Sequence, residues 1–152
     1  MRRLAAVLPL ALAAAACGGS GHEPAAPENA YLTGVRVNGT SVRFEFKSRP
    51  LDVRAHYERR SRLSECGSGR PIRLHGRAFV VVHFTPAASA EIRGEQVVPT
   101  YTGPRRLSGP GPVLDTAKSC DFEADLGWAI GVERRMPVEV SRDGSTVTVS
   151  FG

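Results

Sequence analysis

The chain has 152 residues, of which 41% are hydrophobic and 23% are charged. This length supports one domain with its own hydrophobic core, and we do not expect two packed domains. The formal net charge is +5, and it falls to +3 without residues 1–16, which contain two arginines and no acidic residue. A surplus this small argues against a nucleic-acid-binding protein, whose basic residues are more clustered.

The N-terminal segment has the pattern of a bacterial export signal. Arg2 and Arg3 precede an apolar run that ends at Ala14-Ala15-Ala16 and is shorter than the roughly 20 residues of a membrane-spanning helix. Cys17 follows directly, and the arrangement resembles the lipobox of bacterial lipoproteins, whose cysteine is diacylated and becomes the first mature residue. These lipoproteins prefer leucine where this chain has Ala14, so an ordinary cleaved signal is the alternative. We expect a lipoprotein signal peptide over residues 1–16 and a lipid (palmitate) on Cys17.

The segment after Cys17 has little that a core could bury. Residues 18–30 consist mainly of Gly, Ser, Pro and Ala, so we expect residues 17–30 to be the lipidated cysteine and a flexible tether. The tether would hold a domain over residues 31–152 at the outer face of the cytoplasmic membrane, within the cell envelope.

From Tyr31 onward the chain alternates apolar and polar residues, which is typical of half-buried β-strands. This pattern predicts strands near residues 35–37, at 42–46 and at 51–57, with Asn38-Gly39 as the turn between the first two. Residues 59–71 are polar and glycine-rich and predict a long loop. Residues 72–84 keep one apolar phase, and their second half is apolar on both faces, which indicates a central strand.

Residues 87–112 are the least regular part of the sequence. A helical turn fits 87–92 and short strands fit 96–98 and 113–114, while closely spaced Gly and Pro residues in between exclude a helix. Residues 126–132 alternate large apolar residues with small ones, which suggests that something packs closely on the small-residue face.

The C-terminus predicts a hairpin with Asp143-Gly144 as its two-residue turn. This register pairs Arg142 with Ser145, Val140 with Val147, Val138 with Val149 and Met136 with Phe151. It places every apolar residue on one face. Since no segment after the signal has a helical period, we predict an all-β fold, a single antiparallel β-sandwich or partly closed barrel of about seven to nine strands.

Two cysteines remain once Cys17 is lipidated. Export would place Cys66 and Cys120 in a compartment that permits disulfides, so we expect them to bond to each other, with two unpaired thiols as the alternative. Closing a loop of this length would stabilise the fold by roughly 4 kcal/mol in the chain-entropy model.

No catalytic motif stands out, and we expect neither an enzyme nor a cofactor. Three histidines, His56, His75 and His83, lie on predicted strands, but nothing in their spacing fixes a metal site. Gly-x-Ser-x-Gly is absent from the sequence. A small envelope hydrolase that uses one of these histidines with Asp52 or Glu58 is an alternative, and their convergence in one pocket would favour it.

Several arginines occur in three short clusters, at 59–62, 105–106 and 134–135. They could contact an anionic envelope polymer or phospholipid head groups, or they could simply be solvated. The Gly-rich loop around Arg105 and Arg106 could hold an anion, although its prolines remove backbone donors and favour a structural turn.

The second half of the chain resembles a known family. The run YTGPRRL at 101–107, the DFE segment at 121–123, the strand at 126–132 and the closing hairpin at 137–151 are similar to AMIN-like domains of lipoproteins from high-GC bacteria. Segments 42–46, 55–58 and 80–87 fit the opening strands of the same pattern. The chain departs from it at Thr40-Ser41, where relatives have an Asp-Arg pair, and in its closing STVTVSFG.

The resemblance implies a β-rich, non-catalytic module that binds peptidoglycan, another wall polymer or an envelope protein. For such a ligand we expect contacts from Tyr101, Arg105, Arg106 and Trp128, with Trp128 as a core residue in the alternative interpretation. We expect a monomer. A carrier of a lipid or small apolar ligand is a further alternative, and it would need an open apolar cavity of roughly 300 Å³ or more.

Overall fold

The computed structural model describes residues 28–152. The predicted signal peptide, Cys17 and most of the predicted tether lie outside the described residues. The described chain is all-β, with one short 3-10 helix, η1 (Arg60–Arg62), and no α-helix. None of its helices is long and apolar enough to cross a membrane.

The described residues form twelve strands, so the expected seven to nine are not confirmed. The strands are β1 (Ala30–Asn38), β2 (Ser41–Phe46), β3 (Asp52–Glu58), β4 (Ala78–Thr85), β5 (Ala87–Ala88), β6 (Ala90–Arg93), β7 (Gln96–Pro99), β8 (Arg106–Ser108), β9 (Val113–Phe122), β10 (Asp125–Val132), β11 (Val138–Asp143) and β12 (Thr146–Phe151). The excess comes from the short strands β5 to β8, in the region whose sequence pattern is least regular.

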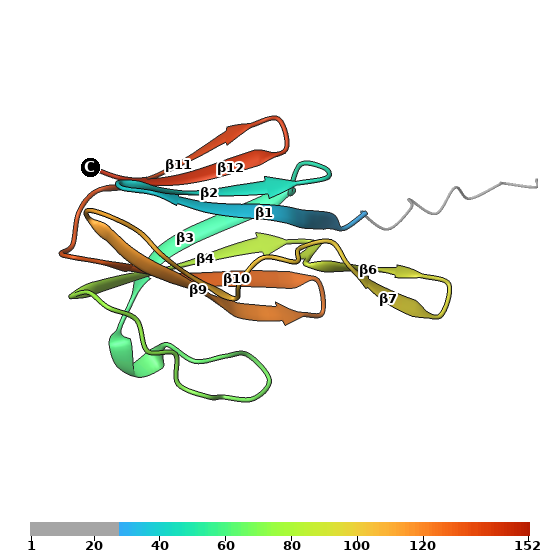
Figure 1. Ribbon diagram of the computed structural model, residues 1–152, viewed down its shortest axis with the longest axis horizontal. Coiled ribbons are helices and arrows are strands. Elements are labelled where there is room, and N and C mark those ends of the chain that lie inside the picture. Colours follow the sequence, from blue (N-terminus) through green and yellow to red (C-terminus); the bar gives the residue numbers. More distant parts are fainter. Residues whose placement is uncertain (1–27) are drawn as a thin grey trace, which may run out of the picture.

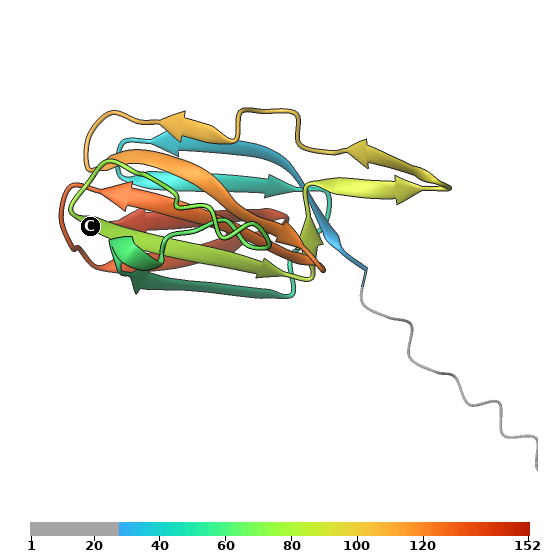
Figure 2. The same ribbon diagram turned by 90° about the horizontal axis from the view of Figure 1, so that it is seen from below.

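Most strands belong to two five-stranded sheets, neither of which closes into a barrel (Figure 1). The first has the order β11-β12-β2-β1-β5 and the second β3-β4-β10-β9-β8. All pairings are antiparallel except the short contact between β1 and β5. The hairpin β6–β7 is a separate two-stranded sheet, and it projects from one end of the molecule (Figure 2).

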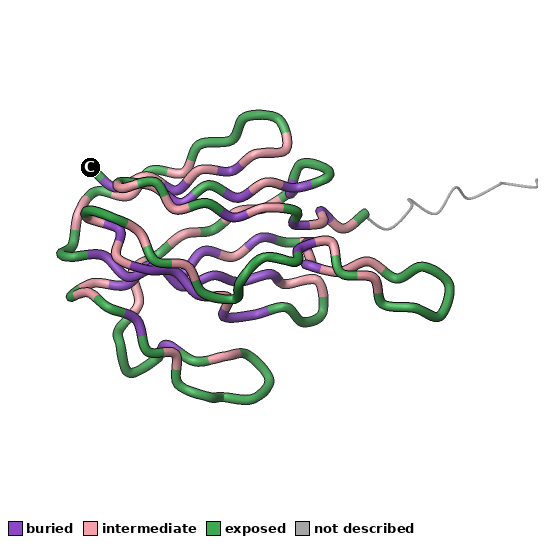
Figure 3. The backbone as a smooth tube through the Cα atoms, in the orientation of Figure 1, coloured by how far each residue is buried: buried purple, intermediate pink, exposed green. Residues whose placement is uncertain are grey.

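The two large sheets share one hydrophobic core. Phe44 of the first sheet packs on Phe84 and Trp128 of the second, with ring centroids 4.9 Å and 5.9 Å apart. Buried positions alternate with less buried ones along β2 and β12, as the period-two pattern predicts (Figure 3). The apolar phases predicted for 42–46 and 126–132 are therefore confirmed.

A second hydrophobic cluster lies on the outer face of the second sheet. There Leu63 and Leu74, from the long connection between β3 and β4, pack with Phe79, Val81 and Ala129 of the sheet. This cover explains why β4 is apolar on both faces. It also explains the small residues of β10, because a Cβ atom at Gly131 would collide with the carbonyl oxygen of His75.

A disulfide between Cys66 and Cys120 fastens this connection to β9, which confirms the predicted bond. The amide of Cys66 also donates to the carbonyl oxygen of Ser119 at 2.9 Å. Within the connection, Arg60 joins its two ends by donating to the carbonyl oxygens of Leu74 and Gly76, at 3.0 Å and 2.7 Å. The connection, residues 59–77, is called the covering loop below.

Three predicted elements differ from the structure. The strand expected from residue 72 begins only at Ala78, because Gly76 has φ +120° and turns the backbone where it touches Val132. The helical turn expected at 87–92 is strand β5 and part of β6. The short strand expected at 113–114 is the start of the ten-residue strand β9.

The register predicted for the C-terminal hairpin is wrong: each residue of β11 pairs with a residue of β12 two positions later than predicted. Val140 lies opposite Val149 rather than Val147, and the turn is Gly144–Ser145. The first hairpin has the same offset, with Gly39–Thr40 as its turn. Both glycines have positive φ, +50° and +55°, and a two-residue turn can place such a glycine first. Because the shift is an even number of residues, the apolar face is kept.

We predict that Ala124→Gly stabilises the protein. Glu123 and Ala124 form the turn between β9 and β10 with φ of +49° and +61°, a conformation that is unfavourable for residues with a Cβ atom. Glycine at 124 should raise the free energy of unfolding by about 1 kcal/mol in chemical denaturation. Ala55→Gly, within strand β3, is the control and should lower it. A stability of Ala124→Gly below that of the unchanged protein would contradict this turn geometry.

The variant Cys66→Ala/Cys120→Ala should lose up to about 4 kcal/mol of unfolding free energy. The bond joins residues 54 positions apart, so it removes much conformational freedom from the unfolded chain. A reducing agent should cause the same loss in the unchanged protein and none in the variant. Equal stability of the variant and the oxidised protein would show that the covering loop holds without the bond.

Candidate functional site

The strongest charge concentration lies where the covering loop meets the connection from β10 to β11. We call it the arginine end, and it comprises Arg59, Arg60, Arg62, Arg77, Arg134 and Arg135. All six residues are exposed, and five of them line one broad surface hollow together with Tyr57 and Glu58. Two of the arginine clusters noted in the sequence therefore meet in space, and Arg77 joins them.

The arginine end accounts for the charge surplus of the domain. Residues 28–152 contain 18 basic and 14 acidic side chains, a net charge of +4. The six arginines and the two carboxylates beside them, Glu58 and Glu133, also sum to +4. The other charged residues of 28–152 sum to zero, so the net positive charge of the domain equals that of this one end.

The packing around these arginines leaves their charges available. Arg60 stacks over the ring of Phe79 at 4.4 Å and Arg135 over that of Tyr57 at 4.3 Å. The Tyr57 hydroxyl is held in turn, donating to the carbonyl oxygen of Met136 at 2.7 Å. Within residues 28–152, none of the six arginines forms an ion pair with a carboxylate. Fixed, unneutralised guanidinium groups suit phosphate or carboxylate ligands.

A second feature is a groove on the outer face of the second sheet, beside the covering loop. We call it the outer-face groove; it has a volume of about 240 Å³ and is lined by His56, Val81, His83, Ser119, Asp125 and Ala129 together with residues of the covering loop. Ser119 and Cys120 lie against the backbone of Gly127, where a Cβ atom would be only 2.8 Å from Ser119 Oγ.

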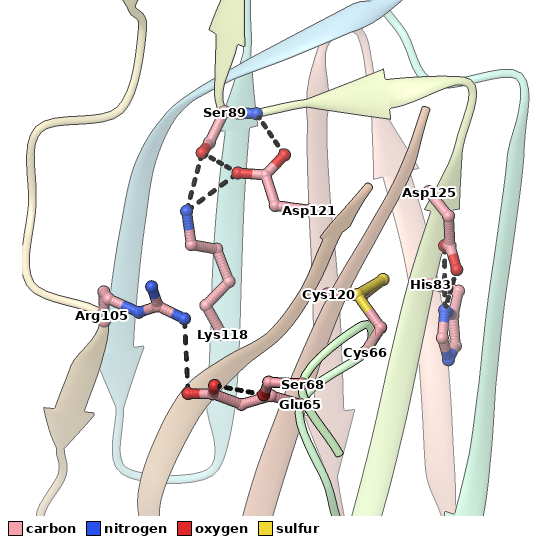
Figure 4. The surroundings of a disulfide bond; sticks show 10 residues. All are labelled: Glu65, Cys66, Ser68, His83, Ser89, Arg105, Lys118, Cys120, Asp121 and Asp125. Carbon is pink, nitrogen blue, oxygen red and sulfur yellow. Dashed lines mark hydrogen bonds and ion pairs between the residues drawn. A yellow bond between two sulfur atoms is a disulfide. The ribbon is translucent and has the colours of Figure 1, made fainter. Parts of the chain in front are cut away.

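Polar groups converge in the outer-face groove. His83 Nδ1 lies 2.9 Å from Asp125 Oδ1, and the His56 ring lies parallel to the His83 ring with centroids 6.2 Å apart (Figure 4 shows the His83–Asp125 pair). The Ser119 hydroxyl is buried and has no hydrogen-bond partner among residues 28–152. The groove therefore offers two imidazole rings and an unsatisfied hydroxyl to a ligand.

The outer-face groove continues into the arginine end. His56 lines the groove, the adjoining hollow toward Asp52 and the hollow among the arginines. Glu58 and Arg62 are likewise shared between the groove and the arginine end. The three hollows thus follow one another along β3, so an extended ligand could contact all of them.

The histidines converge only in part. His56 and His83 meet in the groove, whereas His75 lies elsewhere, with Nδ1 3.0 Å from the buried Asp115 carboxylate. The carboxylates considered from sequence are not the close partners, since Asp52 pairs with Arg54 at 2.7 Å and Glu58 lies 4.0 Å from His56. Asp125 pairs with His83 instead, across neighbouring strands, a contact that sequence spacing does not reveal.

Residues 28–152 contain no group of three side chains that could hold a metal ion. The space between the two large sheets is filled by aromatic and aliphatic side chains, including Phe44, Phe84 and Trp128, which are completely buried. The carrier hypothesis therefore finds no open apolar cavity among the described hollows, all of which lie at the surface.

The ligand-contact residues expected from sequence do not form one surface. Tyr101 and Trp128 are buried and pack edge-to-face at 5.7 Å, and the Tyr101 hydroxyl donates to the carbonyl oxygen of Pro104 at 2.8 Å. Burial also raises the pKa of the Tyr101 hydroxyl. Arg106 binds the buried Asp115 carboxylate at 2.6 Å. Only Arg105 remains largely exposed, 3.5 Å from Glu65.

A polar network flanks the disulfide on its other side (Figure 4). Lys118 Nζ donates to Asp121 at 2.9 Å and to Ser89 Oγ at 2.8 Å, and Ser89 donates to Asp121 through both its hydroxyl and its amide. Burial opposes ionisation of the Asp121 carboxyl, but these hydrogen bonds outweigh it and lower its pKa. Hydrogen bonds from Ser68 and Arg70 lower the pKa of Glu65 in the same way.

Comparison with known families gives one match. A model of the AMIN-like domain matches residues 30–149, which is most of the chain. Searches of curated proteins and of solved structures found no match.

Acid should weaken the fold through Asp121. Its folded pKa lies below the ordinary 3.8, so the stability it contributes is present above about pH 4 and is lost as the pH falls through the folded value. Asp121→Asn should therefore lose less stability than the unchanged protein between pH 5 and pH 2.5, measured as the melting temperature. Asp143→Asn, at the tip of an exposed hairpin, is the control and should behave like the unchanged protein. Equal acid sensitivity of all three proteins would show that Asp121 is not a source of it.

Proposed function

We propose, since the chain belongs to the AMIN-like domain family, that it is an exported, lipid-anchored module that binds an anionic polymer of the cell envelope. An AMIN-like domain indicates an envelope-associated module, generally without catalytic activity. The arginine end carries the more specific proposal. Its net charge equals the charge surplus of the domain, and its guanidinium groups form no ion pair with a carboxylate of residues 28–152.

The shape of the surface supports a linear ligand. The outer-face groove and the hollows on either side of it follow β3, whose seven residues span about 23 Å at 3.3 Å per residue. A polymer chain lying along β3 would reach the imidazoles of His56 and His83 and then the arginine end. Repeated weak contacts of this kind suit a module held close to its ligand by a tether, because tethering raises the effective concentration.

The lipid anchor belongs to the same proposal. Cys17 would attach the chain to the outer face of the cytoplasmic membrane, and residues 18–29 would link the lipid to β1. The domain would then remain within reach of the wall while staying bound to the membrane.

A small envelope hydrolase is a second candidate, favoured by the hydrogen bond between His83 and Asp125. Such a pair can orient an imidazole for proton transfer. However, no hydroxyl or thiol of residues 28–152 is hydrogen-bonded to His83, so a nucleophile activated by this base is missing from the structure. His83→Asn should abolish any release of wall fragments by the protein, while the arginine end would still hold it to the wall.

Removing charge from the arginine end should weaken binding to purified peptidoglycan sacculi that retain their anionic polymers. We expect Arg62→Ser/Arg77→Ser to lower the affinity about tenfold, as for two partly exposed charge contacts, and the loss to shrink in high salt. Arg36→Ser/Arg43→Ser, on the first sheet, removes the same charge and is the matched control. Co-sedimentation measures both variants.

Stripping the anionic polymers from the sacculi separates the possible ligands. Loss of binding on stripping would support the arginine end as the binding surface. Binding that survives stripping and is insensitive to Arg62→Ser/Arg77→Ser would shift the ligand to the glycan or peptide of the wall. Absence of binding in both preparations would contradict wall targeting and favour a protein partner.

A further inference from the structure

The hairpin β6–β7 exposes an apolar face that no other described residue covers. Ile92 lies opposite Val97 and Ala90 opposite Pro99, so the strand alternation places these four side chains on one face. Ile92 is 77% exposed and Val97 is 70% exposed. A directly paired Ile and Val at this exposure is unusual, because such pairs stabilise a sheet when something buries them.

The opposite face of the hairpin is held against the body of the domain. Glu91 pairs with Lys47, which follows β2, with Nζ 3.0 Å and 3.1 Å from the two carboxylate oxygens. The hydrogen bond from Lys47 is the largest contribution to lowering the pKa of Glu91. Because the Glu91 face is turned toward the body, the Ile92 face is turned outward.

The hairpin lies at the end of the molecule where the chain enters the fold. Ala30, at the start of β1, pairs with Ala87 of β5, and β6 begins three residues later. Figure 1 shows β1 beginning beside the projecting hairpin. Residues from Cys17 to Ala30 therefore connect the predicted lipid to this end and to no other.

The remaining exposed large hydrophobic residues lie at the same end. Phe122 is 61% exposed and precedes the turn at 123–124, whose Ala124 carbonyl oxygen accepts the amide of Ala87. Leu51 is 63% exposed and precedes Asp52, which pairs with Thr85 at the end of β4. All four exposed large hydrophobic residues of the described chain thus gather at one end. The arginine end, with η1, lies at the other end of the sheets (Figure 1).

We propose that the apolar face of β6–β7, with Phe122 beside it, docks into the interfacial region of the lipid bilayer. The inference rests on the proposed membrane anchor for its biological setting. Thirteen residues from Cys17 to Ala30 span at most about 45 Å and have a root-mean-square length of about 20 Å as a Gly-rich chain, so the anchor keeps this end near the bilayer. Docking would orient the domain, with its arginine end facing away from the membrane and toward the wall.

A lipid surface fits this face better than a second copy of the chain. The ribbon is two strands wide and presents one Ile and one Val as its large side chains, which is far less than the roughly 1,200 Å² that a stable protein interface buries. A bilayer requires no such area when a tether already supplies the local concentration. Arg93 lies on the opposite face, beside Glu91, with which it pairs, so it leaves the Ile92 face apolar.

The test attaches the domain to vesicles without relying on Cys17. Residues 18–152 contain every described strand and both hydrophobic clusters. They would carry an N-terminal hexahistidine tag and bind vesicles of phosphatidylglycerol, phosphatidylethanolamine and a nickel-chelating lipid. An environment-sensitive fluorophore is placed at Glu95→Cys in the hairpin tip or, as the matched control, at Glu133→Cys beside the arginine end.

We expect the label at 95 to shift its emission to the blue and to be quenched by spin-labelled lipid, and the label at 133 to show neither change. The further substitutions Ile92→Ser and Val97→Ser should abolish the response at 95 without changing vesicle attachment or the melting temperature. A label at 95 that keeps its aqueous emission on the vesicles would overturn the proposal. A blue shift that appears without vesicles and grows with protein concentration would also overturn it, because a second copy would then cover the face.

The lipid anchor is tested separately, by incorporation of a palmitate analogue into the full-length chain and its Cys17→Ala variant during expression in a bacterium. Loss of labelling in Cys17→Ala alone supports the anchor. Lack of labelling in both would remove the anchor from the proposed function, while the vesicle result would still decide whether the hairpin docks into lipid.

Discussion

The surface features of this domain depend on how the covering loop packs on the outer face of the second sheet. Leu63 and Leu74 cover Phe79, Val81 and Ala129, and the bond from Cys66 to Cys120 fixes the loop to β9. Without this loop β4 would expose a hydrophobic face to water. The loop covers only part of that face, and the outer-face groove lies along the boundary between the loop and the uncovered part of the sheet. The same loop delivers Arg59, Arg60, Arg62 and Arg77 to one place.

The domain is polarised along its strands. Within residues 28–152, one end carries the arginines without ion pairs, and the other carries all four exposed large hydrophobic residues together with the start of β1. The net charge of residues 28–152, +4, does not reveal this polarity, because it says nothing about where the charges lie. A molecule with this polarity suits a position between two chemically different layers, a lipid bilayer on one side and an anionic polymer on the other.

Residues of the same type that look equivalent in the sequence have different surroundings in the structure. Arg105 and Arg106 are neighbours, yet Arg106 neutralises the buried Asp115 while Arg105 stays largely in water. His75 and His83 share one phase of a predicted strand, yet His83 faces the groove beside Asp125 and His75 closes over Asp115. The strand begins only after Gly76, so the two histidines never share a sheet face.

The sequence by itself determined the all-β character, the apolar phase of most strands and the identity of the bonded cysteines. It did so because period-two alternation and the exclusion of helix by glycine and proline are local properties, and because the expected lipidation of Cys17 would leave only two cysteines to pair. The small residues of 126–132 also predicted a closely packed neighbour, which is the covering loop.

Tertiary structure decided the rest. Both hairpin turns lie one residue beyond their expected positions, since glycine takes the first place in each turn, and the alternation tolerates that shift. The pairing of His83 with Asp125, the burial of Tyr101 and Trp128, and the gathering of distant arginines at one end join residues tens of positions apart, and such contacts leave no trace in local spacing.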